Sequence, residues 1–382
     1  MSLYRTWRPR TFAELVGQNV VVQTLETALT SDRLNHAYLF SGPRGSGKTS
    51  AAKIMARCIN CINGPTATPC NTCINCQQII AGTAMDVSEI DAASNRGIDE
   101  IRALRESVKF APTSMKYKVF IIDEAHMLTK EGANAFLKTL EEPPAHAIFV
   151  LATTNPEALP PTILSRCQRY AFRRIPVSTM ISRMRLICSA EAIDIEDGAL
   201  SVIAYRADGG LRDALTMLEQ VAAYHSGPEP ITPQTVNDAF GSTGRTFAAT
   251  IVSSILAEEA VTALLTLESA NDSGIDMVGL LRNIIAEYRN LIVAKISPEL
   301  LKRDLSTEDI LRTHELLGHA TQSKIIRALR FFNDAIAASR WSANPRVEIE
   351  TVILKLLTIK DDPTLEALTV RMAELEARLA SR

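Results

Sequence analysis

The chain has 382 residues, a length that predicts two or three domains, each large enough to bury its own core. Hydrophobic residues make up 46% and charged residues 22%, which is typical of globular proteins and excludes a wholly disordered chain. Lys and Arg total 41 against 43 for Asp and Glu, so the net charge of −2 excludes a uniformly basic coat for nucleic acid and permits a local basic surface. The sequence contains no apolar stretch of membrane-spanning length and no apolar leader core, so we expect a cytoplasmic protein.

The hydrophobic pattern changes along the chain. Apolar segments of strand length alternate with helical patterns as far as about residue 172, and apolar residues then recur at helical spacing. Four strands are predicted, over residues 37–41, 87–91, 118–123 and 148–153. The third is apolar on both faces, as a strand covered on both sides requires. The pattern predicts an α/β domain with a parallel sheet flanked by helices, followed by all-α domains.

Turn-forming clusters at residues 173–176, 226–230 and 241–244 interrupt the helical periodicity and suggest domain boundaries. We therefore expect units at 1–173, 174–240 and 241–360, with a tail at 361–382. In the tail, Leu365, Leu368, Met372, Leu375 and Leu379 follow the spacing of an amphipathic helix. Such a helix either packs on the preceding helical unit or a neighbouring chain, or links to absent C-terminal regions.

A phosphate-binding pattern follows the first predicted strand and opens a helix. The motif G-x-x-x-x-G-K-[ST] is matched by Gly42, Pro43, Arg44, Gly45, Ser46, Gly47, Lys48 and Thr49, with Ser50 next in the helix. Glycines let backbone N–H groups face phosphates, Lys48 reaches the β- and γ-phosphates, and Thr49 is a ligand for Mg²⁺. The alternative is an incidental glycine-rich turn, which the flanking strand and helix disfavour.

Polar residues also follow the other predicted strands. Asp123 and Glu124 end the third strand at the sheet edge where ligands of open α/β sheets bind, and Thr154 ends the fourth. Asp123 is predicted to hold Mg²⁺ through water and Glu124 to orient and deprotonate the attacking water. Taken alone, the two carboxylates could equally be a solvated strand end. Arg166 and Arg212 could reach a nucleotide or form surface salt bridges.

Five of the seven cysteines lie between residues 58 and 76, which indicates a metal site more readily than disulfides in a reducing compartment. Cys61, Cys70, Cys73 and Cys76 supply four thiolates, enough for a closed, structural zinc site. The spacing alone does not exclude Cys58, because it forms a ligand-like pair with Cys61.

These motifs occur in the order found in the AAA+ clamp-loader ATPases. The chain most resembles the gamma/tau family of bacterial DNA polymerase III, and the resemblance is strong over residues 1–240. Further matching segments are Tyr4-Arg5-Thr6-Trp7-Arg8-Pro9, Val16-Gly17-Gln18, Glu89-Ile90-Asp91-Ala92-Ala93-Ser94 and Leu137-Lys138-Thr139-Leu140-Glu141-Glu142-Pro143-Pro144. The resemblance implies a RecA-like AAA+ core with an inserted zinc module at about 58–79, an all-α lid and an all-α collar.

The resemblance also implies roles for individual residues. Thr154 is expected to be sensor 1, Arg212 sensor 2, and Arg166 a finger supplied to the ATP of a neighbouring subunit. Trp7, Arg8, Pro9 and Val16 are expected to border the adenine. The family pattern places Cys61 in the zinc site and Cys58 on the preceding helix. The implied cofactors are ATP, Mg²⁺ and structural Zn²⁺.

The implied function is loading of a ring-shaped sliding clamp onto primed-template DNA, as an ATPase without a polymerase active site. Implied partners are delta and delta-prime subunits, further copies of this chain, the clamp and the polymerase III core. Arg96 and Lys138 are candidates for DNA contact, with solvated surface charge as the alternative reading. The competing functions are another AAA+ motor such as a branch-migration helicase, which the zinc module disfavours, and a nucleotide-bound scaffold, which the intact catalytic residues disfavour.

Overall fold

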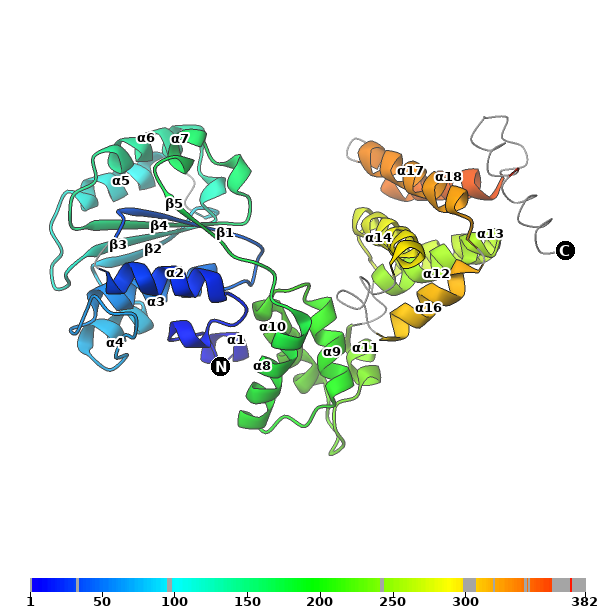
Figure 1. The fold of residues 1–382 in the computed structure, drawn as a ribbon, viewed down its shortest axis with the longest axis horizontal. Helices are drawn as coiled ribbons and strands as arrows, with labels where there is room; N and C mark the ends of the chain where they lie inside the picture. The colour runs from blue at the N-terminus through cyan, green and yellow to red at the C-terminus, as the bar shows by residue number, and fades with distance from the viewer. Residues whose placement is uncertain are drawn as a thin grey trace. The chain divides into compact units, whose positions relative to one another are not determined.

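The computed structural model describes two compact units, Met1–Ala239 and Phe240–Arg382. Within them, the described residues are 2–31, 34–94, 98–240, 244–297, 307–318, 320–339, 342, 344–358 and 372. Figure 1 shows a sheet with flanking helices and a helical group in the first unit, and helices in the second. Arg96 and, apart from Met372, the tail predicted at 361–382 lie outside the described residues.

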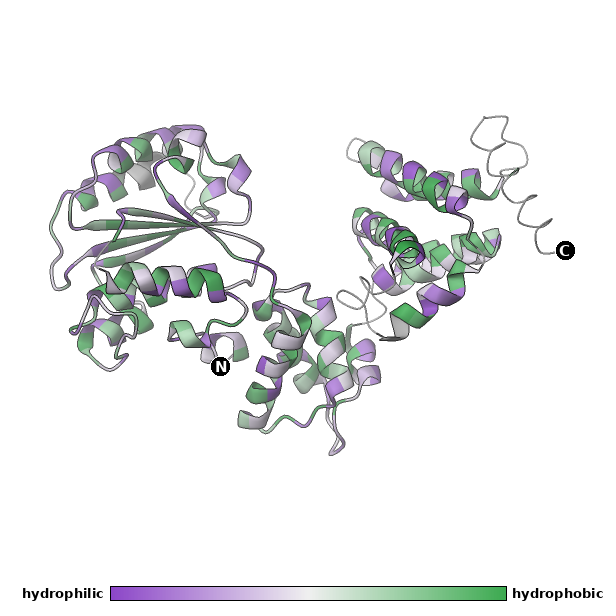
Figure 2. Cartoon of the chain, viewed as in Figure 1, coloured by the Kyte–Doolittle hydropathy of each residue, from purple (hydrophilic) through white to green (hydrophobic). Residues whose placement is uncertain are grey.

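The first unit is built on a five-stranded sheet. Its strands are β1 (Ala37–Ser41), β2 (Val87–Asp91), β3 (Lys118–Asp123), β4 (Ala147–Thr153) and β5 (Gln168–Ala171). The order is β2-β3-β4-β1-β5, and every pairing is parallel. All residues of β4 and the four central residues of β3 are buried, and Figure 2 shows hydrophobic residues along these strands. The predicted parallel α/β fold is confirmed.

Helices cover both faces of this sheet. They are α2 (Asn19–Thr30) and α3 (Lys48–Asn60) on one face, and α5 (Ile98–Val108), α6 (Lys130–Glu141) and α7 (Pro161–Leu164) on the other (Figure 1). Val119 and Ile121 pack into the core with α2 and α3, whereas Phe120 and Ile122 pack into the opposite core, which includes Phe136 of α6. The alternation along β3 therefore buries both faces of the strand.

Strand β5 is an addition to the four strands predicted from the sequence. It pairs in parallel with β1, so that Tyr38 lies opposite Gln168 and Phe40 opposite Tyr170. Only Tyr170 is buried within β5, because the strand lies at the edge of the sheet. A four-residue strand with polar side chains at Gln168 and Arg169 carries no apolar run, and the prediction missed it for that reason.

The rest of the first unit is helical. It comprises α1 (Leu3–Thr6), α4 (Ile74–Ala81), α8 (Val177–Ala190), α9 (Asp197–Arg206), α10 (Leu211–Tyr224) and α11 (Pro233–Phe240), with short 3₁₀ turns at Phe12–Glu14, Ala125–Met127 and Pro156–Ala158. Helix α1 packs against α10, and α8 and α9 pack together. The helices α8 to α11 form the all-α region expected after the sheet.

The second unit is all-helical over its described residues. Its helices are α12 (Gly244–Leu256), α13 (Ala260–Asp272), α14 (Met277–Ile296), α16 (Thr307–Leu317), α17 (Gln322–Ser339) and α18 (Pro345–Leu357). One core joins α12, α14 and α17 through residues such as Ile251, Leu281 and Phe332. Across the described part of both units, no helix combines the length and apolar character needed to cross a membrane.

Candidate nucleotide site and cysteine cluster

The phosphate-binding motif forms the turn between β1 and α3. Gly42 and Gly45 have φ angles of +148° and +73°, a region that favours glycine. A Cβ on Gly42 would lie 2.3 Å from the Phe172 carbonyl oxygen, and a Cβ on Gly45 would lie 2.8 Å from the Gly210 Cα. The turn therefore needs glycine both for its backbone conformation and for close packing against Phe172, which directly follows β5, and Gly210, which directly precedes α10.

Lys48 is the first residue of α3, and only 6% of it is exposed. Its Nζ donates hydrogen bonds of 2.8 Å to the carbonyl oxygens of Gly42 and Pro43. Burial lowers the pKa of Lys48, while the carboxylates of Glu124 and Asp123 act in the opposite direction. The ammonium group thus lies within the phosphate-binding turn, on the side of the two carboxylates.

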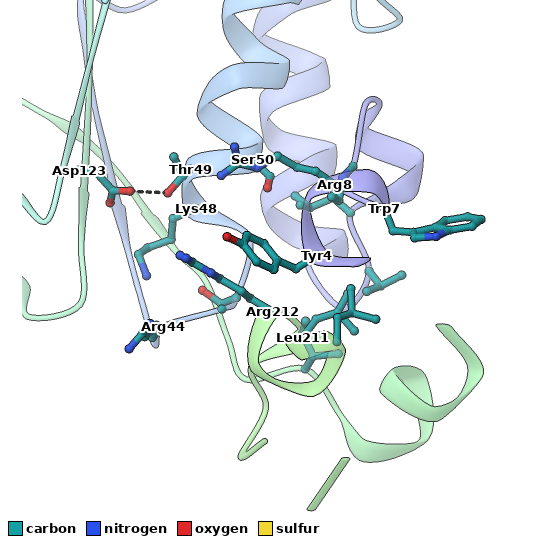
Figure 3. Close-up of a pocket in the computed structure, with 18 of the residues that line it drawn as sticks. Tyr4, Trp7, Arg8, Arg44, Lys48, Thr49, Ser50, Asp123, Leu211 and Arg212 are labelled. Atoms are coloured by element: carbon teal, nitrogen blue, oxygen red, sulfur yellow. Dashed lines mark hydrogen bonds between the residues drawn. The ribbon is translucent and has the colours of Figure 1, made fainter. Parts of the chain in front are cut away.

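The ends of α3 and β3 meet at a direct hydrogen bond. Thr49 Oγ1 donates to Asp123 Oδ2 at 2.7 Å, as Figure 3 shows. A hydroxyl and a carboxylate are oxygen ligands of the kind that Mg²⁺ prefers. The structure therefore brings together the two predicted magnesium residues, which are 74 positions apart in the sequence.

Glu124 has a left-handed backbone, with φ of +47°, directly after β3. Its amide donates to Asp123 Oδ1 at 3.0 Å, and its Oε2 accepts a hydrogen bond of 3.1 Å from Thr154 Oγ1. His126 Nδ1 lies 3.4 Å from the same Oε2 and 3.0 Å from Thr153 Oγ1. A residue held in a sparsely populated conformation with its carboxylate fixed by neighbours is typical of functional sites.

A pocket opens over the phosphate-binding turn (Figure 3). It is lined by Tyr4, Trp7, Arg8, Pro9, Leu15, Val16, Arg44, Gly45, Ser46, Gly47, Lys48, Thr49, Ser50, Asp123, Glu124, Ile175, Leu211, Arg212 and Leu215. Four basic side chains face two carboxylates, so the pocket has the excess positive charge that attracts a polyanion. Of the residues predicted for the nucleotide, Gly42, Pro43, Thr154 and Arg166 do not line it.

Five lining residues of this pocket are not among the predicted site residues. Leu15, Ile175, Leu211 and Leu215 supply apolar surface, and Tyr4 adds an aromatic ring. Leu15 and Leu211 directly precede the predicted residues Val16 and Arg212, so adjacency was the only available signal for them. Ile175 and Leu215 carry no local signal, because the fold alone brings them to the pocket.

The two predicted arginines have different surroundings. The Arg212 guanidinium carbon lies 4.9 Å from the centre of the Tyr4 ring, inside the pocket. Arg166 lies outside it, where its guanidinium donates to Thr162 O at 2.9 Å and to Glu141 Oε1 at 2.8 Å. Its side chain is 35% exposed, so Arg166 is presented at the surface.

Four cysteines form a cluster at the ends of α3 and α4. The sulfur atoms of Cys61, Cys70, Cys73 and Cys76 all lie within 4.8 Å of one another. Cys61 Sγ and Cys70 Sγ are 3.6 Å apart, close to the spacing of about 3.8 Å between thiolates bound tetrahedrally to zinc at about 2.3 Å. Backbone N–H groups of Thr72 and Cys73 lower the pKa of Cys70 to about 6, which favours the thiolate that a metal binds.

Cys58 lies apart from this cluster. It is fully buried in α3, and its Sγ lies 3.7 Å from the carbonyl oxygen of Ala67. Burial raises the pKa of Cys58 to about 12, and its Sγ is not among the four sulfur atoms that lie within 4.8 Å of one another. The four clustered sulfur atoms are therefore placed to hold one metal ion as thiolates, without Cys58.

Three family descriptions match consecutive parts of the chain. Residues 17–176 match "DNA polymerase III, delta subunit", residues 180–227 match "DNA polymerase III clamp loader subunit, ATPase lid domain", and residues 231–372 match "DNA polymerase III subunits gamma and tau domain III". The chain is 40% identical to the DNA polymerase III subunit tau of Bacillus subtilis (strain 168) over 385 residues, which covers 98% of this chain and 67% of that protein. The chain belongs to the gamma/tau family of DNA polymerase III subunits.

Other gamma/tau relatives differ in how much of their length is matched. The Escherichia coli (strain K12) DNA polymerase III subunit tau is 40% identical over 314 residues, covering 82% of this chain and 48% of that protein. The chain thus spans between about half and two thirds of the length of these relatives. Among solved structures, the Thermotoga maritima RuvB Holliday junction branch migration motor is distant, with 21% identity and a TM-score of 0.48 over 71% of this chain and 86% of that one.

Proposed function

We propose that this gamma/tau chain is an ATP-driven clamp-loader subunit, which hydrolyses ATP to open the sliding clamp and place it on primed DNA. One observation carries the proposal. The hydrogen bond from Thr49 Oγ1 to Asp123 Oδ2 joins the phosphate-binding turn to the end of β3, beside Lys48 and Glu124. A positively charged pocket with a paired hydroxyl and carboxylate suits a nucleoside triphosphate with its metal ion.

Different residues of the pocket would contact different parts of the nucleotide. The triphosphate would lie against the backbone of residues 42–50, with Lys48 and Arg212 as the nearest cations. The adenine would lie toward Trp7, Arg8, Pro9 and Val16. Thr49 and Asp123 would hold magnesium, which when bound neutralises charge on the β- and γ-phosphates.

Hydrolysis depends on Glu124. Its carboxylate would orient the attacking water and accept the proton that water loses, while Thr154 holds Oε2 in place through the hydrogen bond of 3.1 Å. Thr154, as sensor 1, would exchange this bond for one to the γ-phosphate side of the nucleotide. Glu124 would thereby respond to the state of the nucleotide.

Arg166 acts on a neighbouring subunit. It lies outside the pocket of its own chain and is partly exposed, so it is available to the ATP site of the next subunit as a finger. The partners expected from the family are delta and delta-prime subunits, further copies of this chain, and the polymerase III core. Lys138, exposed on α6, and Arg96 are proposed to touch DNA phosphates.

A clamp-loader role also implies a division of the chain into domains. We assign residues 1–173 to the AAA+ core, 174–240 to the lid, 241–360 to the collar and 361–382 to a helical tail. The cysteine cluster would hold a structural zinc ion within the core, since four thiolates leave no open position for chemistry. We expect a subunit that acts in bacterial DNA replication to lie in the cytoplasm.

The decisive experiment measures ATP hydrolysis by the chain assembled with delta and delta-prime, with and without clamp and primed-template DNA. A clamp loader hydrolyses faster when both are present. Hydrolysis stimulated by branched DNA in the absence of a clamp would favour a branch-migration motor, and tight ATP binding without turnover would favour a scaffold.

A further inference from the structure

The N-terminal segment Ser2–Trp7 borders the pocket and contacts two of the helices that follow the sheet. The backbone N–H of Leu3 donates to Glu219 Oε2 of α10 at 3.1 Å. Trp7 Nε1 donates to Glu191 Oε1, at the end of α8, at 2.8 Å. The segment therefore makes direct bonds to both α8 and α10, while Tyr4 and Trp7 line the nucleotide pocket.

Tyr4 places an aromatic face against Arg212. The guanidinium carbon lies 4.9 Å from the ring centre, within the range of a cation–π contact. Figure 3 shows the two side chains projecting into the same part of the pocket from the N-terminal segment and from α10. The contact spans the pocket wall between two elements that are more than two hundred positions apart in sequence.

The contact with the Tyr4 ring engages Arg212 through its positive charge. The guanidinium group also has five N–H donors, which suit hydrogen bonds to an anion such as phosphate. Among the described residues, Arg212 has no carboxylate within ion-pair distance. Because Arg212 also lines the pocket, its donors are available to an anionic ligand there.

We propose that Ser2–Trp7 is a strap that ties α8 and α10 to the nucleotide pocket, and that Tyr4 is a positioning residue that holds Arg212 ready for the terminal phosphate. This inference rests on the proposed ATP-binding function and adds a residue to it. Without the ring, Arg212 has to be ordered by the ligand itself, and the affinity falls by the cost of that ordering.

The test compares Tyr4→Leu, which removes the ring, with Tyr4→Phe, which keeps it. Affinities for ATP and ADP are measured by titration calorimetry on the 382-residue chain. Tyr4→Leu is expected to weaken ATP binding by about two- to fivefold, as loss of a partly exposed cation–π contact implies, with a smaller effect on ADP. Tyr4→Phe is expected to bind as the unaltered chain does.

The same substitution in an Arg212→Ala chain shows whether Tyr4 acts by positioning Arg212 or whether its loss simply disturbs the structure. In Arg212→Ala, the change Tyr4→Leu should have no further effect on ATP affinity, because the group that it positions is absent. An equal loss in both backgrounds would overturn the inference, as would unchanged ATP affinity in Tyr4→Leu alone.

The strap has an independent readout that needs no change at Tyr4. Trp7 and Trp341 are the two tryptophans of the chain, so Trp341→Phe leaves Trp7 as the only source of tryptophan emission. Saturating ATP is expected to shift Trp7 emission, and Glu191→Leu is expected to reduce that shift. An ATP-insensitive Trp7 in a protein that binds ATP would contradict the strap.

If the pocket does not bind ATP at all, the experiments give a result different from the one expected when only the role of Tyr4 is wrong. If Lys48→Ala binds ATP as tightly as the unaltered chain, the pocket is not the nucleotide site and the proposed function itself is wrong. If Lys48→Ala abolishes binding and Tyr4→Leu has no Arg212-dependent effect, only the role of Tyr4 is wrong.

Discussion

Asp86, immediately before β2, is expected to be a strong determinant of the stability of the sheet unit. The residue is 1% exposed, and its carboxylate accepts backbone hydrogen bonds from Thr113, Ser114 and Met115 at 2.8, 2.8 and 3.0 Å. These three residues lead into β3, which ends at Asp123. The single carboxylate therefore fixes the approach to β3, the strand that ends at Asp123.

Replacing Asp86 by alanine leaves three backbone donors without their acceptor. At about 1 kcal/mol for each hydrogen bond lost, Asp86→Ala should lower the free energy of unfolding by about 3 kcal/mol. Asp86→Asn keeps one carbonyl oxygen in place of two carboxylate oxygens, so its cost should be about 1–2 kcal/mol.

The same hydrogen bonds to Asp86 make the stability of the fold depend on pH. Burial acts to raise the pKa of Asp86, but the backbone donors of Thr113, Ser114 and Met115 outweigh it and hold the pKa below its usual value. A carboxyl with a lowered pKa stabilises the fold above its unfolded pKa of about 3.9, and that contribution is lost as the pH falls through the folded value. The stability difference between the unaltered chain and Asp86→Asn should therefore shrink below about pH 4.

Urea unfolding measures both effects. In a Trp341→Phe background, the emission of Trp7 reports on the sheet unit, and the three chains are compared between pH 3 and pH 7. A cost below about 0.5 kcal/mol for Asp86→Ala at pH 7 would refute the role given to these hydrogen bonds, as would a difference between the unaltered chain and Asp86→Asn that stays constant down to pH 3.

Three further predictions concern the site. Arg166→Ala should leave ATP binding by its own chain intact and lower turnover of the assembly; in mixed assemblies, a defect confined to the site of the altered chain would contradict action in trans. Cys61→Ser should release one zinc ion per chain and Cys58→Ser should not, as metal analysis by mass spectrometry will show; the reverse result would reverse the ligand choice. Thr154→Val should lower kcat about tenfold with little change in ATP affinity, because Glu124 loses the donor at its Oε2; steady-state kinetics with unchanged kcat would refute this positioning.

The sequence predicted the features whose signal is local. The four strands rich in apolar residues, the turn at residues 42–49 and the cysteine spacing each depend on neighbours within about twenty positions. The pairing of Thr49 with Asp123 also followed, because parallel strands end at a common edge of a sheet.

What the sequence did not predict depends on contacts between distant segments. The strand order β2-β3-β4-β1-β5 places β5 beside β1 across more than a hundred positions, and its polar residues give no local signal. Tyr4 reads as an ordinary residue of the N-terminal segment until the fold brings Arg212 to its ring face. The left-handed backbone of Glu124 likewise arises from the turn that follows β3, where no glycine marks it.

The most direct test of the central claim is ATP binding and hydrolysis by Glu124→Gln, measured in the assembly with delta, delta-prime, clamp and primed DNA. Glutamine keeps the shape of the side chain but cannot accept the proton from water. ATP affinity is expected to stay close to that of the unaltered chain, and the hydrolysis rate is expected to fall by at least about 100-fold, as loss of a general base implies. Hydrolysis by Glu124→Gln at the rate of the unaltered chain would show that the base lies elsewhere and that the catalytic site has been wrongly assigned.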